Sequence, residues 1–257
     1  MATPPNPQLE QDSLQEPPAF PPAAPRDPAW NIIDVLVLGA GTFLVINVVA
    51  TLILVPVIAA RHITGKLPVT LVAKAAIPAE VIAYVLLIVI TKVVLGMRGH
   101  PRLLTAVRWN WPPLKAAGSL ALLGIACAIL VVKAGSLFNI PPDLPIEEMM
   151  KDRFVANMFL VFGILPAPFV EELYFRGLLY PALERKVGNA AAIVLTAAAF
   201  AGMHASQLAS SVAPLVMLLV VGLILTVIRS VTGSVAAAFV FHVMYNGSLF
   251  LLDALAK

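Results

Sequence analysis

Three short motifs with ionisable or amide side chains interrupt the apolar second half of the chain and could carry out acid–base chemistry. They are Glu171-Glu172 with Arg176, then His204, and then His242 with Asn246. An ionised side chain at the centre of a bilayer costs roughly 2.5 to 3.5 kcal/mol on insertion scales, so a set of them is rarely kept for folding alone. The motifs therefore predict a reaction site within the membrane.

The first motif predicts two different roles for its two carboxylates. A helix advances by about 100° per residue, so residues four apart share a face. Glu172 and Arg176 have this spacing and are expected to form an ion pair. Glu171 points to a different face and stays free, so it is the better candidate for a general base.

The other two motifs are expected to lie near Glu171. If the segments on either side of Gly188 form an antiparallel hairpin, Glu171 precedes the turn by 17 residues and His204 follows it by 16, so both lie at one depth. His242 and Asn246 are four residues apart and face the same way. Asn246 is the natural hydrogen-bond donor to a substrate carbonyl.

Structural explanations compete with this interpretation. A lone intramembrane His or Asn often bonds to a neighbouring helix, and Glu172 with Arg176 could be a structural ion pair. Two further ionisable residues, Glu80 and Lys133, lie in other apolar segments. Glu80 is interpreted as a satisfied contact between helices and Lys133 as a residue that reaches the membrane surface, so neither is placed in the site.

The elements that position these motifs are predicted to be membrane-spanning helices. Hydrophobic residues make up 60% of the chain and charged residues 12%, with a mean hydropathy of +0.93. The fold class is therefore an all-α, polytopic membrane helix bundle of about seven helices, with six to eight possible because Pro166 and Pro168 could split the fourth. The expected helices are Ile32 to Ala60, Ala73 to Leu95, Leu114 to Phe138, Phe154 to the turn at Val187-Gly188-Asn189, Ala190 to Ser206, Pro214 to Arg229, and Ser234 to Leu252.

The remaining composition limits the class of partner. Residues 1–30 contain nine prolines and are predicted to be a disordered tail. The single cysteine, Cys127, excludes a disulfide framework. The net charge of +3 comes with basic residues in a loop between helices, which indicates topology and contact with membrane lipid rather than nucleic-acid binding.

The three motifs also carry a family resemblance. Glu171-Glu172-x-x-x-Arg176, Phe200-x-x-x-His204 and His242-x-x-x-Asn246, in this order, resemble the signature motifs of the CPBP (ABI) intramembrane protease family, which includes the type II CAAX prenyl proteases. The resemblance covers about residues 160–250. It divides the chain into the tail, N-terminal transmembrane helices over 31–150, and a catalytic CPBP-like helical core over 151–257.

The resemblance implies an intramembrane endopeptidase in which Glu171 activates water. His204, His242 and Asn246 would hold that water or stabilise the oxyanion, and Glu172 and Arg176 would support them. A divalent metal such as zinc could be held by Glu171, His204 and His242, although the same residues could activate water without a metal. The implied partners are lipid and a peptide or membrane-protein substrate, in a multi-pass protein of the bacterial cytoplasmic membrane.

Other functions remain possible at this point. The chain lacks a His-Glu-x-x-His helix, a Gly-x-Ser-x-Gly turn and a pair of intramembrane aspartates, so other intramembrane hydrolase chemistries are disfavoured. The main alternative is a non-catalytic scaffold or peptide-toxin immunity protein of the same fold. A proton-coupled transporter would also use buried Glu and His, but two related halves with broken helices are not evident.

Overall fold

A computed structural model describes residues 31–100, 102–138, 144–208 and 211–255. The predicted tail, residues 1–30, lies outside the described residues. The part of the chain that is described is built of helices without a β-strand, which confirms the predicted all-α class.

The first two helices, α2 (Ile32–Ala60) and α3 (Val69–Met97), form a long hairpin. The bounds of α2 are those predicted, because Asn31 and Asp34 form a reciprocal capping box at its start. Helix α3 begins at Val69 rather than at Ala73, since it can start directly after Pro68. The internal prolines Pro56 and Pro78 do not interrupt either helix.

The connection to the second half contains one predicted helix and two short ones that the hydropathy pattern missed. Helix α5 (Leu114–Gly135) matches the predicted third span except that it ends three residues earlier. Helices α4 (Leu103–Ala106) and α6 (Pro145–Lys151) are too short to show an apolar period.

The predicted fourth helix is split, as its prolines suggested. Helix α7 (Arg153–Ile164) ends before Pro166, and the chain continues through α8 (Pro166–Glu172), the π-helix η1 (Leu173–Leu179) and α9 (Tyr180–Val187). The two parts meet at an angle of 42°. A proline lacks the backbone N–H that would continue the ladder, which explains the bend.

The last three helices are α10 (Asn189–Met203), α11 (Val212–Thr232) and α12 (Val235–Leu255). Gly188 and Gly233 form the tight turns before α10 and α12 with φ angles of +81° and +65°, which side chains with a Cβ rarely adopt. Helix α10 ends at Met203, so His204 caps it rather than lying inside it as predicted.

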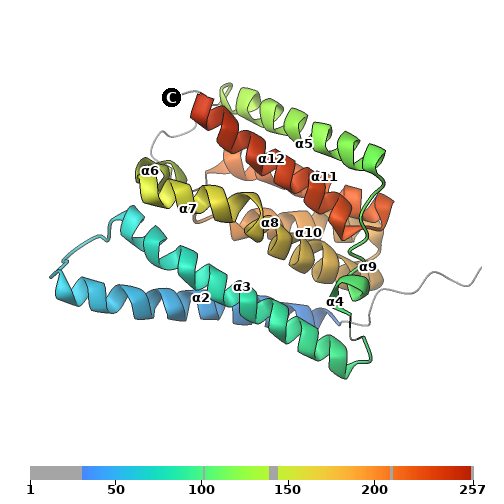
Figure 1. Cartoon of the computed structure of the whole chain (residues 1–257), viewed down its shortest axis with the longest axis horizontal. Coiled ribbons are helices and arrows are strands. Elements are labelled where there is room, and N and C mark those ends of the chain that lie inside the picture. Colours follow the sequence, from blue (N-terminus) through green and yellow to red (C-terminus); the bar gives the residue numbers. More distant parts are fainter. Residues whose placement is uncertain (1–30, 101, 139–143, 209–210, 256–257) are drawn as a thin grey trace, which may run out of the picture.

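The helices form a bundle in which α7, α8 and α9 lie between two groups (Figure 1). Helix α12 packs against α5, α11 packs against α10, and α2 packs mainly against α3. Among the described residues, five helices are long and apolar enough to span a membrane, and the bent pair makes a sixth. Helix α10 corresponds to the fifth of the seven predicted helices and has only 15 residues.

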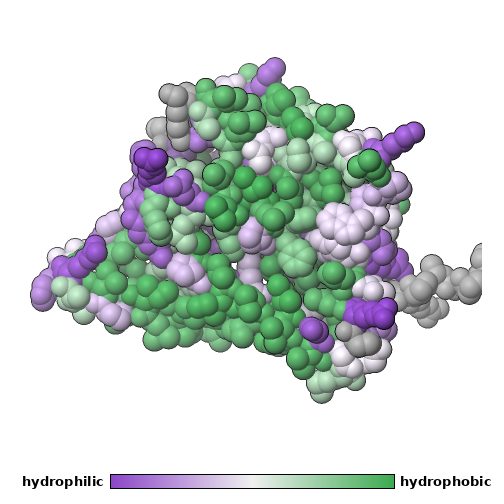
Figure 2. Space-filling model, in the orientation of Figure 1, coloured by the Kyte–Doolittle hydropathy of each residue, from purple (hydrophilic) through white to green (hydrophobic). Residues whose placement is uncertain are grey.

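The surface agrees with a multi-pass membrane protein. Hydrophobic side chains cover the long faces of the helices in view, whereas hydrophilic side chains gather toward the helix ends (Figure 2). Many large apolar residues on α2 and α3 are exposed, among them Phe43 at 70% and Val89 at 50%. Such continuous apolar surface is stable in lipid and costly in water.

Close packing of α5 on α12 depends on Gly124. A Cβ at this position would lie 2.6 Å from the backbone oxygen of Phe241, so Gly124→Ala must push the helices apart. We expect a loss of stability of about 1 to 3 kcal/mol, measured by thermal melting in detergent. Gly118→Ala on the same helix is the control, because nothing lies within 4 Å of its Cβ. Equal melting of the two variants would show that α5 does not depend on this contact.

Candidate active site

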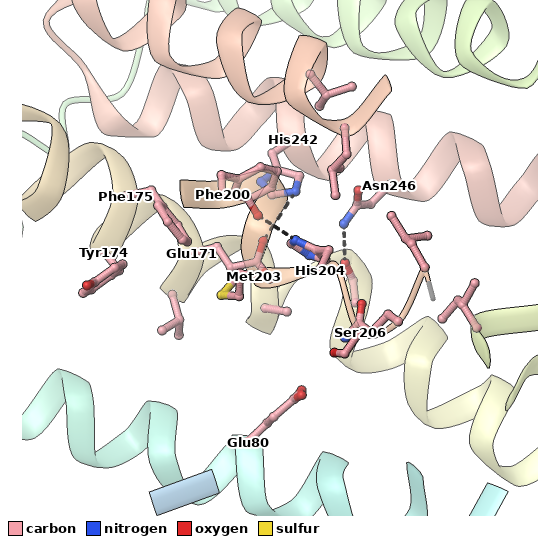
Figure 3. Close-up of a pocket in the computed structure, with 18 of the residues that line it drawn as sticks. Glu80, Glu171, Tyr174, Phe175, Phe200, Met203, His204, Ser206, His242 and Asn246 are labelled. Carbon is pink, nitrogen blue, oxygen red and sulfur yellow. Dashed lines mark hydrogen bonds and ion pairs between the residues drawn. The ribbon is translucent and has the colours of Figure 1, made fainter. Parts of the chain in front are cut away.

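Glu171 lies in the last turn of α8, directly after the bend. Its side chain is 9% exposed and lines the wall of a large cavity (Figure 3). No hydrogen bond is recorded for its carboxylate among the described residues, and its Oε2 lies 3.8 Å from His242 Nε2. The predicted free carboxylate is therefore present at the cavity wall.

The neighbouring Glu172 forms the predicted ion pair with Arg176. Glu172 Oε1 lies 2.9 Å from an Arg176 terminal nitrogen, and both side chains are fully buried. Arg176 also donates to the backbone oxygen of Gly222 at 3.0 Å and lies 4.7 Å from the centre of the Phe200 ring. These contacts join η1 to α10 and α11, so the ion pair is a junction between three elements.

The π-helix that follows Glu172 was not predicted. Wider turns of this kind are rare and often mark functional sites. Every residue of η1 except Tyr174 is buried. The Tyr174 hydroxyl donates to the backbone oxygen of Val35 at 3.0 Å and occupies the space above Gly39, so it connects this segment to α2.

His242 on α12 contacts both glutamates. Its Nδ1 lies 2.8 Å from Glu172 Oε1, and its Nε2 lies 3.8 Å from Glu171 Oε2. An ionised carboxylate only accepts hydrogen bonds, so Nδ1–H donates to Glu172. This bond fixes the ring and leaves Nε2 directed at Glu171. The predicted approach of His242 to Glu171 is confirmed.

His204 reaches the same cavity from the end of α10 (Figure 3). Its Nδ1 lies 3.0 Å from the backbone oxygen of Phe200, and because a carbonyl only accepts, Nδ1–H is the donor. The Phe200 ring packs between the two histidines, with ring centres 5.1 Å from His204 and 5.7 Å from His242. The position of His204 is thus fixed by the helix end, and its Nε2 remains available.

Asn246 lies one turn beyond His242 on α12 and also lines the cavity. Its Nδ2 donates to the backbone oxygen of Gly163 at 2.8 Å. That oxygen belongs to the last turn of α7, beside the bend. The amide has two N–H groups, so this bond leaves one for a substrate.

The cavity has a volume of about 1380 Å³ and is mostly apolar. Its opposite wall is formed by the α2–α3 hairpin, from which Glu80 points toward the side that carries Glu171 (Figure 3). No hydrogen bond or ion pair is recorded for Glu80 among the described residues. The interpretation of Glu80 as a satisfied contact between helices is therefore wrong. Its midpoint position in an apolar helix was the signal that could have placed it at the site.

The possible metal ligands at the site are Glu171, His204 and His242. Among the residues that the structure describes, no group of three or more His, Cys, Asp or Glu side chains is arranged to hold one. His204 and His242 each use Nδ1 for a protein acceptor and keep Nε2 free, as metal-binding histidines do. Glu171, His204 and His242 therefore do not form a three-ligand site as they stand.

Comparison with known proteins identifies one family. Residues 153–248 match the family model described as type II CAAX prenyl endopeptidase Rce1-like. The match confirms the resemblance predicted from the motifs and includes all of the motif residues. Searches of curated proteins and of solved structures gave no match.

Proposed function

We propose that the chain hydrolyses a peptide bond of a membrane-associated substrate with water activated by Glu171, because residues 153–248 match the Rce1-like family model of type II CAAX prenyl endopeptidases. The family supports protease activity in general. The observation that carries the finer proposal is the connected set Glu172, His242 and Glu171 on the wall of a cavity large enough for a peptide.

The gap between Glu171 and His242 suits a water molecule. Glu171 Oε2 and His242 Nε2 are 3.8 Å apart, so one water can lie about 2.8 Å from both atoms. With Nδ1 protonated toward Glu172, the neutral His242 ring accepts at Nε2. Such a water gives one hydrogen to each acceptor and directs its lone pairs into the cavity, which is the orientation that a nucleophile needs.

Proton transfer then follows ordinary general acid–base chemistry. Glu171 takes a proton from the water while the water oxygen bonds to the scissile carbonyl carbon. The carbon–nitrogen bond breaks, and the proton passes from Glu171 to the leaving amine. The products are a carboxylic acid and an amine, and Glu171 returns to its starting state.

Asn246 and His204 are proposed to stabilise the oxyanion. Asn246 has an N–H group that Gly163 does not use, and donors aimed at a developing oxyanion are worth a factor of about 10² to 10³ in turnover. His204 donates from Nε2 when its ring is protonated, since Nδ1 is held by Phe200. Glu172 and Arg176 position His242 and do not contact the substrate.

The chemistry is proposed to need no bound metal. Purified protein that has been dialysed against a strong chelator is expected to cleave a confirmed substrate at the original rate, with metal content measured by mass spectrometry of the same sample. A rate that falls with metal content and returns on addition of zinc would contradict this proposal. It would favour a zinc ion held by Glu171, His204 and His242.

The proposed setting is the cytoplasmic membrane of a bacterium. The partners are membrane lipid, which covers the apolar faces of the spans, and a peptide or membrane protein that enters the cavity. A non-catalytic scaffold or immunity protein would keep the fold without needing Glu171 to be free.

Comparison of membrane proteomes tests the proposed function. Cells that express the full chain and cells that express Glu171→Gln at the same level are compared for new peptide termini in membrane proteins. Termini that require Glu171 are the expected result and name the substrate. If the two proteomes have identical termini, while the protein is present in both, the scaffold interpretation replaces the enzyme.

A further inference from the structure

The charged side chains on the wall of the cavity are all acidic. Its charged side chains are Glu80, Glu147, Glu171 and Asp253, and among the residues that the structure describes no Lys or Arg lines it. Each of the two histidines on the wall donates a hydrogen bond from one ring nitrogen to a protein acceptor. A substrate group that enters this cavity therefore meets carboxylates rather than fixed positive charge.

Glu80 holds a special position among these acidic residues. It lies near the middle of α3, and Ala76 and Tyr84, four residues before and after it, also line the cavity. This face of α3 is thus directed at the cavity along about one turn on each side of Glu80. Its side chain points across the cavity toward the wall that carries Glu171 (Figure 3).

An unpaired carboxylate in such surroundings needs a partner. Taking a charge out of water is costly unless an opposite charge or hydrogen bonds compensate for it. Among the residues that the structure describes, no hydrogen bond or ion pair is recorded for Glu80 with α3 or with the facing helices. A positive group of the substrate would supply the missing partner.

We propose that Glu80 determines substrate specificity by binding a cationic side chain, Lys or Arg, next to the scissile bond while Glu171 activates water on the opposite wall. This inference rests on the proposed function of the same site. The preferred cleavage point is then beside a basic residue.

Binding to an inactive protein tests the inference without requiring turnover. The probes are apolar peptides that carry one lysine or one acetyl-lysine at successive positions, so that members of a pair differ only in charge. Each is titrated into the full chain with Glu171→Gln in nanodiscs of zwitterionic lipid. For at least one position we expect the lysine peptide to bind about tenfold more tightly or better, the scale of a charge-assisted hydrogen bond.

Adding Glu80→Gln should bring the two affinities within about twofold, while Glu80→Asp should keep part of the preference because it retains the charge. Glu148→Gln is the matched control, since Glu148 is an exposed acidic residue that does not line the cavity. Thermal melting of each variant shows that it is folded. Equal affinities at every position, or a lysine preference that survives Glu80→Gln, would overturn the inference.

Turnover by the wild-type chain separates this inference from the proposed function. If lysine peptides bind preferentially but none is cleaved, the hydrolase proposal fails and the specificity of Glu80 stands. If peptides are cleaved with equal efficiency for lysine and acetyl-lysine, the hydrolase stands and Glu80 is not the specificity residue. An equal fall in turnover of both members of a pair on Glu80→Gln would assign Glu80 to the chemistry instead.

Discussion

Glu171→Gln is expected to lower the turnover of a confirmed substrate by about 10² to 10⁴, the usual contribution of a general base. The amide keeps the shape of the side chain but cannot accept the proton of the attacking water. His242 stays in place because its ring is fixed by Glu172 at 2.8 Å. The rate is measured with purified protein in detergent or nanodiscs, at saturating substrate.

The same variant is expected to fold normally. Glu171 has no recorded hydrogen bond to lose, and the buried ion pair beside it is untouched. Glu148→Gln removes an exposed carboxylate outside the cavity and should leave the rate unchanged. Wild-type turnover in the Glu171 variant would rule out Glu171 as the base.

Arg176→Ala is expected to have the largest effect on stability, a loss of about 3 to 5 kcal/mol, because it leaves Glu172 as a buried charge without its partner. It also removes the hydrogen bond to Gly222 and the contact with the Phe200 ring. Thermal melting in detergent should therefore show a large fall for this variant and little change for Glu171→Gln.

A control variant and a double variant test whether the effect of Arg176→Ala comes from the unpaired charge that it leaves on Glu172. Lys186→Ala removes an exposed cation from the neighbouring helix and should melt like the wild type. Replacing both partners, with Glu172→Gln and Arg176→Met together, should be less harmful than Arg176→Ala alone, since no unpaired charge remains. An Arg176→Ala protein that melts with the wild type would show that the pair does not stabilise the fold.

Much of the fold could be predicted from the sequence because the bilayer imposes a length and an apolar composition on each span. The bounds of α2 were predicted, and α5, α11 and α12 differ from expectation by only a few residues. The ion pair of Glu172 and Arg176 was predictable for a similar reason, since helical spacing alone brings such residues together.

The remaining features depend on contacts between helices. A π-turn adds a residue within a helix without any local sequence signal, so η1 could not be foreseen from hydropathy. The predicted hairpin had straight helices on both sides of Gly188, whereas in the structure one side contains η1 and the other ends at Met203 before His204. The cavity that Glu80 faces exists because α2 and α3 stand apart from α10 and α11, which is a property of the assembled bundle.

Mass spectrometry of the reaction in heavy-oxygen water tests the central claim most directly. Purified full-length protein and a substrate from the proteome comparison are incubated in water labelled with oxygen-18. We predict one new C-terminus that carries one heavy oxygen, formed by the wild type and reduced at least about 100-fold with Glu171→Gln. A substrate that the wild type leaves intact, or that both proteins cleave at the same bond and rate, would contradict the account.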